Sequence, residues 1–436
     1  MHIYLFIILS FLFQFGICQF DRVDYSENPN KGGFIRPCYF TNWAIYRNGR
    51  AKFAPEDYAP GLCTHIFYAF AYFNESFEAY AIDPNDLPND SDPLGQYARV
   101  VALKKYDPNL KFVMSFGGWT FSTTTTLFQN MTSSKQNRQK FIKSSIAFVK
   151  KHGFDGIDLD IEYPDSKENF NLLLQEFRLA SYNEKNVKNK LIITAAVPAG
   201  IDIVKKSYDI ATMAKYVDFI NLMTYDFHIT SENKTGYNSP LRTKDSLNII
   251  DAANYWVRGG MPRNKIIIGF PTYAHGFKLS NPNSKDLSVG APASGPANAT
   301  EFAQEPGVAA YFEICEMLAK GAKDFYDPNA QVPYLYQNGE WFSYDNQRSY
   351  FQKIQWLRTK GFGGAFVWAL DFDDLMENVR ELNMVIFKRK VNPMVGEAVS
   401  CIYPLIGTIA KFLGQVKHEL VSVSEITKRA TSTQKP

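Results

Sequence analysis

The sequence is poor in cysteine, in histidine and in net charge, and each shortage excludes a class of function. Its 436 residues include five cysteines and six histidines, and no Cys/His group has the spacing of a metal site. The formal net charge is only +3, and no polybasic block marks a nucleic-acid surface. Beyond residues 1–20, no segment is apolar for long enough to span a membrane. We therefore expect no metal site, no nucleic-acid partner and no later membrane span.

The N-terminal segment 1–20 is almost entirely apolar, and Asp21 is the first charged residue. This pattern predicts a secretory signal peptide at 1–18, although Lys and Arg are missing ahead of the apolar core. The alternative is a signal anchor, for which the segment is short. Secretion agrees with sequons at Asn74, Asn89, Asn130, Asn233 and Asn298. At the other end, residues 416–436 are polar and rich in Ser, Thr and Lys, which predicts a disordered tail.

Removal of the signal peptide would remove Cys18 and leave an even number of cysteines in an oxidising compartment. Cys38 and Cys63 each belong to a strand-like run near the start of the chain, and adjacent parallel strands would bring them together. We expect the pairs Cys38–Cys63 and Cys315–Cys401. No cysteine follows Cys401, so we expect no Cys-rich binding module after it.

Eight apolar runs rich in β-branched and aromatic residues recur along the chain, and most of the gaps between them hold amphipathic, helix-compatible sequence. The runs are 34–40, 62–73, 111–118, 154–161, 191–198, 217–225, 265–273 and 363–370, and helices are predicted at 136–151, 167–180, 244–258 and 402–413. Eight alternating units predict an α/β fold, a closed (β/α)8 TIM barrel. The alternative, an open doubly wound sheet, would call for a glycine fingerprint after the first strand, and the sequence there has none.

The gap between the seventh and eighth runs is far longer than an ordinary connection. It contains strand-like pieces at 332–336 and 341–344 and a helical piece at 309–320. We predict an α+β insertion subdomain at about 275–350. Active sites of such barrels lie at the C-terminal ends of the strands, so this insertion would deepen a groove there.

The fourth run carries three carboxyl groups at alternate positions, Asp158, Asp160 and Glu162. Alternate residues of a strand share a face, so these groups would line up on one side at spacings of roughly 7 Å. Strands of a parallel barrel are buried on both faces, and like charges at this spacing raise one another's pKa. A half-exposed strand with a solvated polar face is the alternative interpretation. The barrel pattern favours an acid at the strand's end, and we assign that role to Glu162.

The acidic run, with Asp155 ahead of it, resembles the Asp-X-X-Asp-X-Asp-X-Glu signature of glycoside hydrolase family 18, the chitinase family. Four more segments resemble strands of that family in the same order, at 38–43, 114–119, 221–226 and 363–370. The resemblance covers about residues 33–413 and implies one catalytic barrel, at 19–415, without a chitin-binding module. It also implies a secreted, extracellular monomer that needs no cofactor and takes chitin or its oligosaccharides as partner.

The resemblance implies a reaction as well, the hydrolysis of β-1,4-linked N-acetylglucosamine polymers with retention of configuration, by endo rather than exo action. Glu162 would protonate the leaving oxygen and then activate water. Asp160 would orient the substrate acetamide, whose carbonyl attacks the anomeric carbon, and Asp158 would share its proton. Tyr225 would hold the acetamide carbonyl, and Asp226 would support the sugar.

Further positions match the family's sugar-binding residues. Trp368 would form the floor of the subsite where the bond breaks, and Trp119 would stack on a sugar. The remaining expected substrate-binding residues are Tyr39, Phe70, Gly117, Gly118, Thr120, Tyr163, Met223, Thr224 and Tyr273.

Four positions depart from the family pattern. Ile161 and His275 stand where Trp and Arg are frequent, and Ser231 lies near a position where relatives carry a Trp on the leaving-group side. Pro84 replaces another frequent Trp. These departures predict a weaker grip on long substrates.

Two other functions remain open. The family includes non-catalytic lectins that bind chitin oligosaccharides, but those typically replace the acid that Glu162 matches. An enzyme acting on the chitobiose core of N-linked glycans is the second alternative, and the aromatic positions favour a longer groove.

Overall fold

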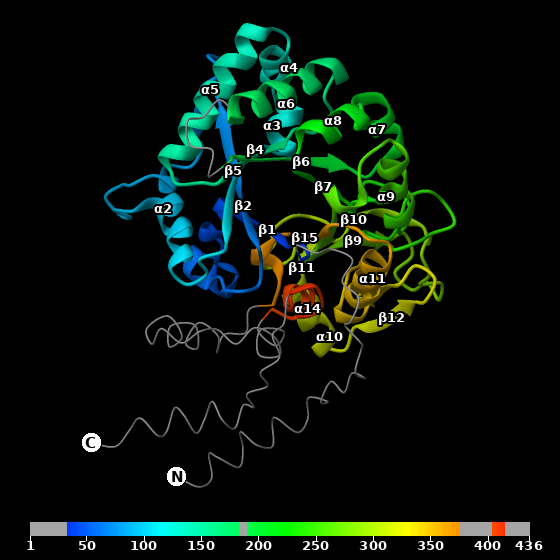
Figure 1. The fold of residues 1–436 in the computed structure, drawn as a ribbon. Helices are drawn as coiled ribbons and strands as arrows, with labels where there is room; N and C mark the ends of the chain where they lie inside the picture. Colours follow the sequence, from blue (N-terminus) through cyan, green and yellow to red (C-terminus); the bar gives the residue numbers. More distant parts are fainter. Residues whose placement is uncertain (1–32, 183–189, 375–402, 415–436) are drawn as a thin grey trace, which may run out of the picture.

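The computed structural model describes residues 33–182, 190–374 and 403–414, and its centre is a closed barrel of parallel strands (Figure 1). Neighbouring strands follow the order β1-β15-β8-β7-β6-β5-β4-β2, and pairing of β1 with β2 closes the ring. The barrel strands are β1 (Pro37–Thr41), β2 (His65–Phe73), β4 (Lys111–Gly117), β5 (Gly156–Asp160), β6 (Ile192–Pro198), β7 (Phe219–Met223), β8 (Ile266–Pro271) and β15 (Gly364–Trp368). Seven of them fall within the predicted runs, β1 ends one residue beyond its run, and the predicted (β/α)8 fold is confirmed.

Helices surround the strands on the outside, and α5, α6, α8, α7 and α9 form an arc in Figure 1. The helices are α2 (Gly95–Val101), α3 (Trp119–Thr124), α4 (Leu127–Thr132), α5 (Lys135–Lys151), α6 (Lys167–Tyr182), α7 (Ile201–Ser207), α8 (Ile210–Tyr216), α9 (Ile249–Arg258), α11 (Gln347–Thr359) and α14 (Pro404–Leu413). The predicted helix at 244–258 begins later, at Ile249. The cause is Asn248, whose side chain accepts a hydrogen bond from the Asp251 N–H at 2.9 Å and caps the first turn.

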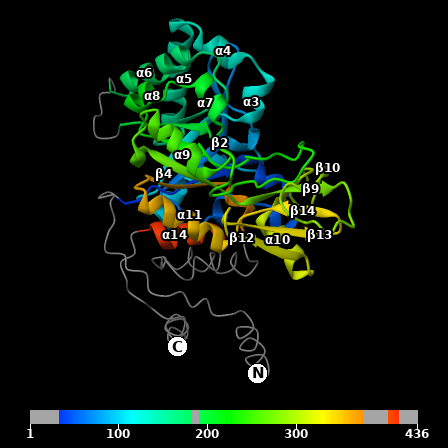
Figure 2. The same cartoon turned by 90° about the vertical axis from the view of Figure 1, so that its right-hand side faces the viewer.

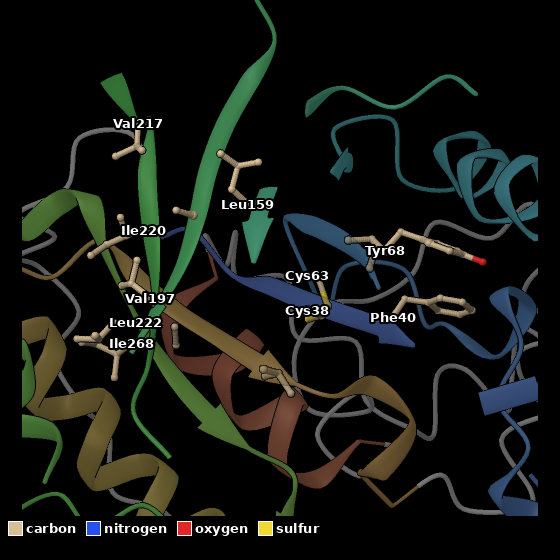
Figure 3. Close-up of a cluster of buried hydrophobic side chains, with 14 of the residues drawn as sticks. Cys38, Phe40, Cys63, Tyr68, Leu159, Val197, Val217, Ile220, Leu222 and Ile268 are labelled. Atoms are coloured by element: carbon tan, nitrogen blue, oxygen red, sulfur yellow. A yellow bond between two sulfur atoms is a disulfide. The ribbon is translucent and has the colours of Figure 1, made fainter. Parts of the chain in front are cut away.

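Alternation along the strands sorts apolar side chains into two clusters. On β1, Cys38 and Phe40 face outward to the helices, whereas Tyr39 joins the cluster inside the barrel. Figure 3 shows part of the outer cluster, with Leu159, Val197, Ile220, Leu222 and Ile268 along successive strands. Burial on both faces explains why the strands could be found as continuous apolar runs.

The segment between β8 and β15 forms a second sheet beside the barrel, which projects to the right in Figure 2. Its elements are β9 (Tyr273–Leu279), β10 (Ala293–Pro296), β11 (Val308–Ala310), α10 (Tyr311–Ala319), β12 (Lys323–Asp327), β13 (Val332–Gln337) and β14 (Glu340–Ser343). The order is β10-β9-β14-β13-β12, with β11 paired to β9. Because β9 begins two residues after β8 ends, the insertion's first strand rises directly from the barrel's rim. A short strand β3 (Ala79–Ala81) pairs antiparallel with β2.

A disulfide joins Cys38 to Cys63, as predicted (Figure 3). The second predicted pair is not tested, because Cys401 lies outside the described residues. So do the predicted signal peptide and the predicted tail. None of the helices in the described part of the chain has the length and apolar character needed to cross a membrane.

Candidate active site

A groove with a volume of about 990 Å³ crosses the mouth of the barrel. It lies at the strands' C-terminal ends, because the last residues of five strands line it. These residues are Gly117, Asp160, Pro198, Met223 and Trp368. This is the end at which (β/α)8 barrels carry their active sites.

The acidic row runs from the barrel interior to the groove along β5. Asp158 is fully buried and accepts three hydroxyl hydrogen bonds, from Tyr39 at 2.9 Å, Ser115 at 2.8 Å and Thr194 at 2.7 Å. Asp160 is 4% exposed, and its Oδ1 has no hydrogen-bond partner among the described residues. Glu162 lies past the end of the strand and lines the groove. The innermost carboxyl group, that of Asp158, is thus fully hydrogen-bonded, whereas those of Asp160 and Glu162 face the groove.

Burial is the main cause of raised pKa values in this row. It raises the pKa of Asp158 to about 6, against the hydrogen bonds that it accepts. Burial, followed by the charges of Glu162 and Asp158, raises the pKa of Asp160 well above its usual range. Burial and then the charge of Asp226 raise the pKa of Glu162 to about 7. Near neutral pH the site therefore holds a carboxylic acid that can donate its proton.

A second polar group faces the row from β7 and β9. Asp226 has a positive φ of 57° and is held by its backbone N–H, which donates to Asn238 Oδ1 at 2.9 Å. Its Oδ1 accepts a hydrogen bond from the Tyr273 hydroxyl group and lies 2.7 Å from Nε2 of His275. Tyr273 and His275 are alternate residues of β9, so they share a face. The insertion therefore supplies the partners of Asp226.

Tyr225 precedes Asp226 and lines the groove. Burial, and next the charge of Asp226, raise the pKa of its phenol well above the usual range. The hydroxyl group is thus kept neutral and remains a hydrogen-bond donor.

Two consecutive glycines bring β4 against β5. Gly117 and Gly118 have φ values of 116° and 89°, which residues with a side chain rarely adopt. A Cβ atom on Gly117 would lie 2.1 Å from the Asp160 carbonyl oxygen, and one on Gly118 would lie 2.7 Å from the Phe70 ring. The turn ends at Trp119, whose ring is 58% exposed beside Tyr163 with 5.8 Å between centroids.

One part of the groove wall is aromatic, and we call it the aromatic half. It consists of Trp43, Phe70, Tyr72, Trp368 and Phe372, which belong to β2 and β15 or follow β1 and β15. Three of these rings contact one another: the Phe70 centroid lies 5.9 Å from that of Trp368 and 6.0 Å from that of Trp43.

The opposite part of the wall is aliphatic, and we call it the aliphatic half. It consists of Pro198, Ala199, Ile203, Ile229 and Leu247. These residues end β6, begin α7, follow β7 and precede α9. In the ring of eight strands, β6 and β7 lie opposite β1 and β2, so the two halves face each other across the barrel mouth.

This arrangement was compared with known proteins. The model of the glycosyl hydrolases family 18 matches residues 36–373. The chain belongs to this family.

Relatives of the family 18 chain carry chitinase names. It is 46% identical over 403 residues to a probable endochitinase of Caenorhabditis elegans, a match that covers 90% of this chain and 62% of the relative. Against an endochitinase of Brugia malayi it is 40% identical, with 78% and 69% covered. The chain thus spans about two thirds of the length of these relatives.

Solved structures agree with this family. The crystal structure of an immunomodulatory active chitinase from Trichuris suis has a TM-score of 0.77 and 41% identity, covering 87% of this chain and 100% of that one. Human YKL-39, described as a pseudo-chitinase that retains chitooligosaccharide binding, has a TM-score of 0.77 and 35% identity, covering 88% and 100%. The family therefore holds both catalysts and binders.

Two residues expected to bind substrate lie beneath the groove of the family 18 barrel. Tyr39 is 1% exposed and uses its hydroxyl group on Asp158. Thr224 is fully buried, and its Oγ1 donates to the Gly269 carbonyl at 2.8 Å and accepts the Gly269 N–H at 2.9 Å. Both residues hold the site from below. The other expected substrate-binding residues line the groove: Phe70, Gly117, Gly118, Trp119, Thr120, Tyr163, Met223, Tyr273 and Trp368.

The positions that depart from the family pattern can also be located in the structure. Ile161 is 2% exposed in the outer cluster, away from the groove, whereas His275 lines the groove. Pro84 and Ser231 are exposed and do not line it. Asp155, the first residue of the acidic signature, accepts the Phe112 N–H at 2.8 Å and pairs with Lys104, so its role is structural.

Sequence reasoning missed the residues that bind Asp158. Ser115 and Thr194 are its direct neighbours in the pairing of β4, β5 and β6. Their shared register could have been found by aligning the three runs at the level of Asp158. The aliphatic half was missed as well, and its members Ile229 and Leu247 lie in a connection that carries no such register.

Proposed function

We propose that this chain hydrolyses β-1,4-linked N-acetylglucosamine polymers by substrate-assisted, retaining catalysis. The observation that carries the proposal is Glu162, a groove-lining carboxyl group with a pKa of about 7 at the end of a buried acidic row. A proton donor of this kind is what cleavage of a glycosidic bond needs.

Glu162 donates its proton to the glycosidic oxygen as the bond to the anomeric carbon breaks. The resulting carboxylate then takes a proton from the water that completes hydrolysis. Burial, and next the charge of Asp226, keep the pKa of Glu162 high enough for the first step.

The nucleophile is the carbonyl oxygen of the substrate's own acetamido group. Asp160 supports this step, because its buried Oδ1 has no partner among the described residues and would accept the acetamido N–H. The neutral hydroxyl group of Tyr225 donates to the acetamido carbonyl. Asp158, anchored by three hydroxyl groups, shares a proton with Asp160.

We also propose that the protein is a secreted, endo-acting monomer. The apolar segment at 1–20 and the Cys38–Cys63 disulfide support secretion. Wall residues on both sides of the catalytic row support endo action, because sugars can then be bound on both sides of the cleaved bond.

The test is release of the fluorophore from a fluorogenic chitotrioside by the secreted protein and by Glu162→Gln. We expect the variant to lose about 1,000-fold in kcat, in the range typical of a general acid. Its affinity for chitotetraose should stay within about threefold, because Gln has nearly the shape of Glu.

A lectin gives a different result. The wild-type protein would then bind chitotetraose and release no more fluorophore than Glu162→Gln. Release without any preference for N-acetylated oligomers would instead count against the acetamide as nucleophile.

A further inference from the structure

Asp226 lines the groove in a backbone conformation that needs support from its neighbours. Its φ of 57° lies in the left-handed region, which residues other than glycine adopt only where the surrounding structure holds them there. Its side chain is 46% exposed, so burial does not fix it either. The charge of this exposed group nevertheless acts on Glu162. Specific bonds must therefore hold Asp226 in place.

Asn238 supplies these bonds, because each of its four polar atoms takes part in a hydrogen bond. Its Oδ1 accepts the Asp226 N–H at 2.9 Å, and its Nδ2 donates to the Tyr273 carbonyl at 3.2 Å. Its backbone carbonyl accepts the Phe227 N–H at 3.1 Å, and its own N–H donates to Ser343 Oγ at 2.9 Å. The residue is 1% exposed. It thus joins the segment after β7 to the first residue of β9.

The side chain of Asn238 fixes both members of the hydrogen bond between Tyr273 and Asp226. The Tyr273 hydroxyl group donates to Asp226 Oδ1, and Asn238 holds the backbone of both residues. An amide suits this place because it carries an acceptor for the N–H and a donor for the carbonyl. A carboxylate would accept the N–H but could not donate to the carbonyl.

The segment that carries Asn238 is anchored below the groove. Ser239 Oγ donates to the Thr224 carbonyl at 2.7 Å and accepts a hydrogen bond from Lys353 Nζ at 3.1 Å. Lys353 is fully buried, and its Nζ lies 2.6 Å from Oδ1 of the buried Asp345. Asn238 is therefore a fixed point against which the exposed Asp226 is placed.

We propose that Asn238 is a positioning residue that holds the Asp226 carboxylate close enough to Glu162 for its charge to act on that group. For turnover the inference rests on the proposed function, in which Glu162 is the proton donor. Asn238 acts through Asp226 and is not among the residues that line the groove. With Asp226 in place, its negative charge opposes ionisation of Glu162, and the acid keeps its proton for the leaving oxygen.

Loss of the Asn238 amide leaves the Asp226 N–H and the Tyr273 carbonyl without their partners, so Asp226 relaxes from the left-handed region and its effect on Glu162 weakens. Other titratable groups also face Glu162 or Asp226, or line the groove near them. They are Asp160, Tyr163, Tyr208, Tyr225, Glu232, Tyr273, His275 and Glu305. A variant of Asn238 alters none of them chemically, so a change in the ionisation of Glu162 reports a movement of charge.

The test is the titration of Glu162 in Asn238→Leu, which removes both side-chain hydrogen bonds. The carboxyl group is followed by NMR in protein labelled with ¹³C at the glutamate carboxyl carbons, and Glu162→Gln identifies its signal. We expect the midpoint to fall from about 7 by about 0.5 pH unit, because a negative charge moves away. The alkaline limb of kcat/KM for chitotetraose should move down by the same amount.

Asn248→Leu is the matched control. Asn248 is also 1% exposed and also accepts a backbone N–H at 2.9 Å, that of Asp251, but it caps α9. This variant should lower the Tm and leave the midpoint of Glu162 unchanged. Thermal unfolding checks that each variant is folded. Asn238→Ser is a second variant with a smaller side chain, and it should lower the midpoint in the same direction.

Asp226→Asn separates positioning from a general loss of structure. Once the charge at this position is removed, Asn238→Leu should shift the midpoint by less than about 0.1 pH unit. An unchanged midpoint when Asp226 is present, an equal shift in the Asp226→Asn background, or an equal shift in Asn248→Leu overturns the inference. The titration does not depend on turnover. If the wild-type protein hydrolyses no chitotetraose, the proposed function fails, and the midpoint still tests the position of Asp226.

Discussion

The two halves of the groove differ in how their walls are built. Three rings of the aromatic half contact one another, from Trp43 through Phe70 to Trp368. The aliphatic half draws its side chains from two separate connections, the one from β6 into α7 and the one between β7 and α9. A substitution in the aromatic half should therefore disturb the neighbouring rings. A substitution in the aliphatic half should disturb only its immediate surroundings.

The halves also differ in their link to the acids. The Tyr39 ring lies 5.1 Å from that of Trp368, and the Tyr39 hydroxyl group donates to Asp158. The aromatic half thus contacts the acidic row through one side chain. Ring positions here should influence turnover as well as binding, whereas positions in the aliphatic half should influence binding.

The largest expected difference in kcat/KM is the one between Trp368→Ala and Ile203→Ala. Loss of the Trp368 ring leaves a cavity beside Tyr39 and Phe70, and such losses cost about 3 kcal/mol. We expect kcat/KM for chitotetraose to fall about 100-fold in Trp368→Ala and less than about threefold in Ile203→Ala. Steady-state kinetics measure both. Equal losses would remove the distinction between the halves.

The barrel and the acidic row could be predicted because burial on two faces and a period of two leave a clear pattern in sequence. The pairing of Cys38 with Cys63 followed from adjacent parallel strands. The insertion was predicted only in part: β13, β14 and α10 were found, but β12, with the charged residues Lys323, Asp324 and Asp327, has no apolar run to mark it.

The structure places the residues predicted at strand ends along the groove, whereas two predicted residues lie beneath it because their side chains point another way. Tyr39 lies on β1 and points into the barrel, and Thr224 directly follows β7 and points toward β8. Ile229 and Leu247 lie on loops, where no periodicity tells which residue faces the groove. Only the folded chain brings those loops opposite the aromatic half.

The pH dependence of kcat/KM should be set by Glu162, where the two halves of the groove meet, and not by residues of either half. Because the pKa of Glu162 is raised to about 7, the proton donor is lost as the pH rises above that value. We expect kcat/KM to fall about tenfold per pH unit above about pH 7. The fall should be the same for chitotetraose and for chitohexaose. A different midpoint for the two substrates would place the limiting proton elsewhere.

The same raised pKa makes a prediction about stability. A carboxyl group with a folded pKa above its unfolded pKa stabilises the fold at low pH, and this contribution is lost as pH rises from about 4 to about 7. Glu162→Gln cannot ionise, so it should unfold at a higher temperature than the wild-type protein at pH 8. At pH 4 the two proteins should have similar Tm values in calorimetry.

Ser231→Trp should give the smallest effect and probes the aliphatic half directly. Ser231 is exposed and lies inside the turn from Ile229 to Glu232, so a ring there could cover the aliphatic surface. A sugar stacks on an aromatic ring for about 1 kcal/mol, and we expect KM for chitohexaose to fall several-fold. Ser294→Trp, on the outer strand β10, is the control for a surface tryptophan, and an equal change there would show that the added ring acts without regard to the groove.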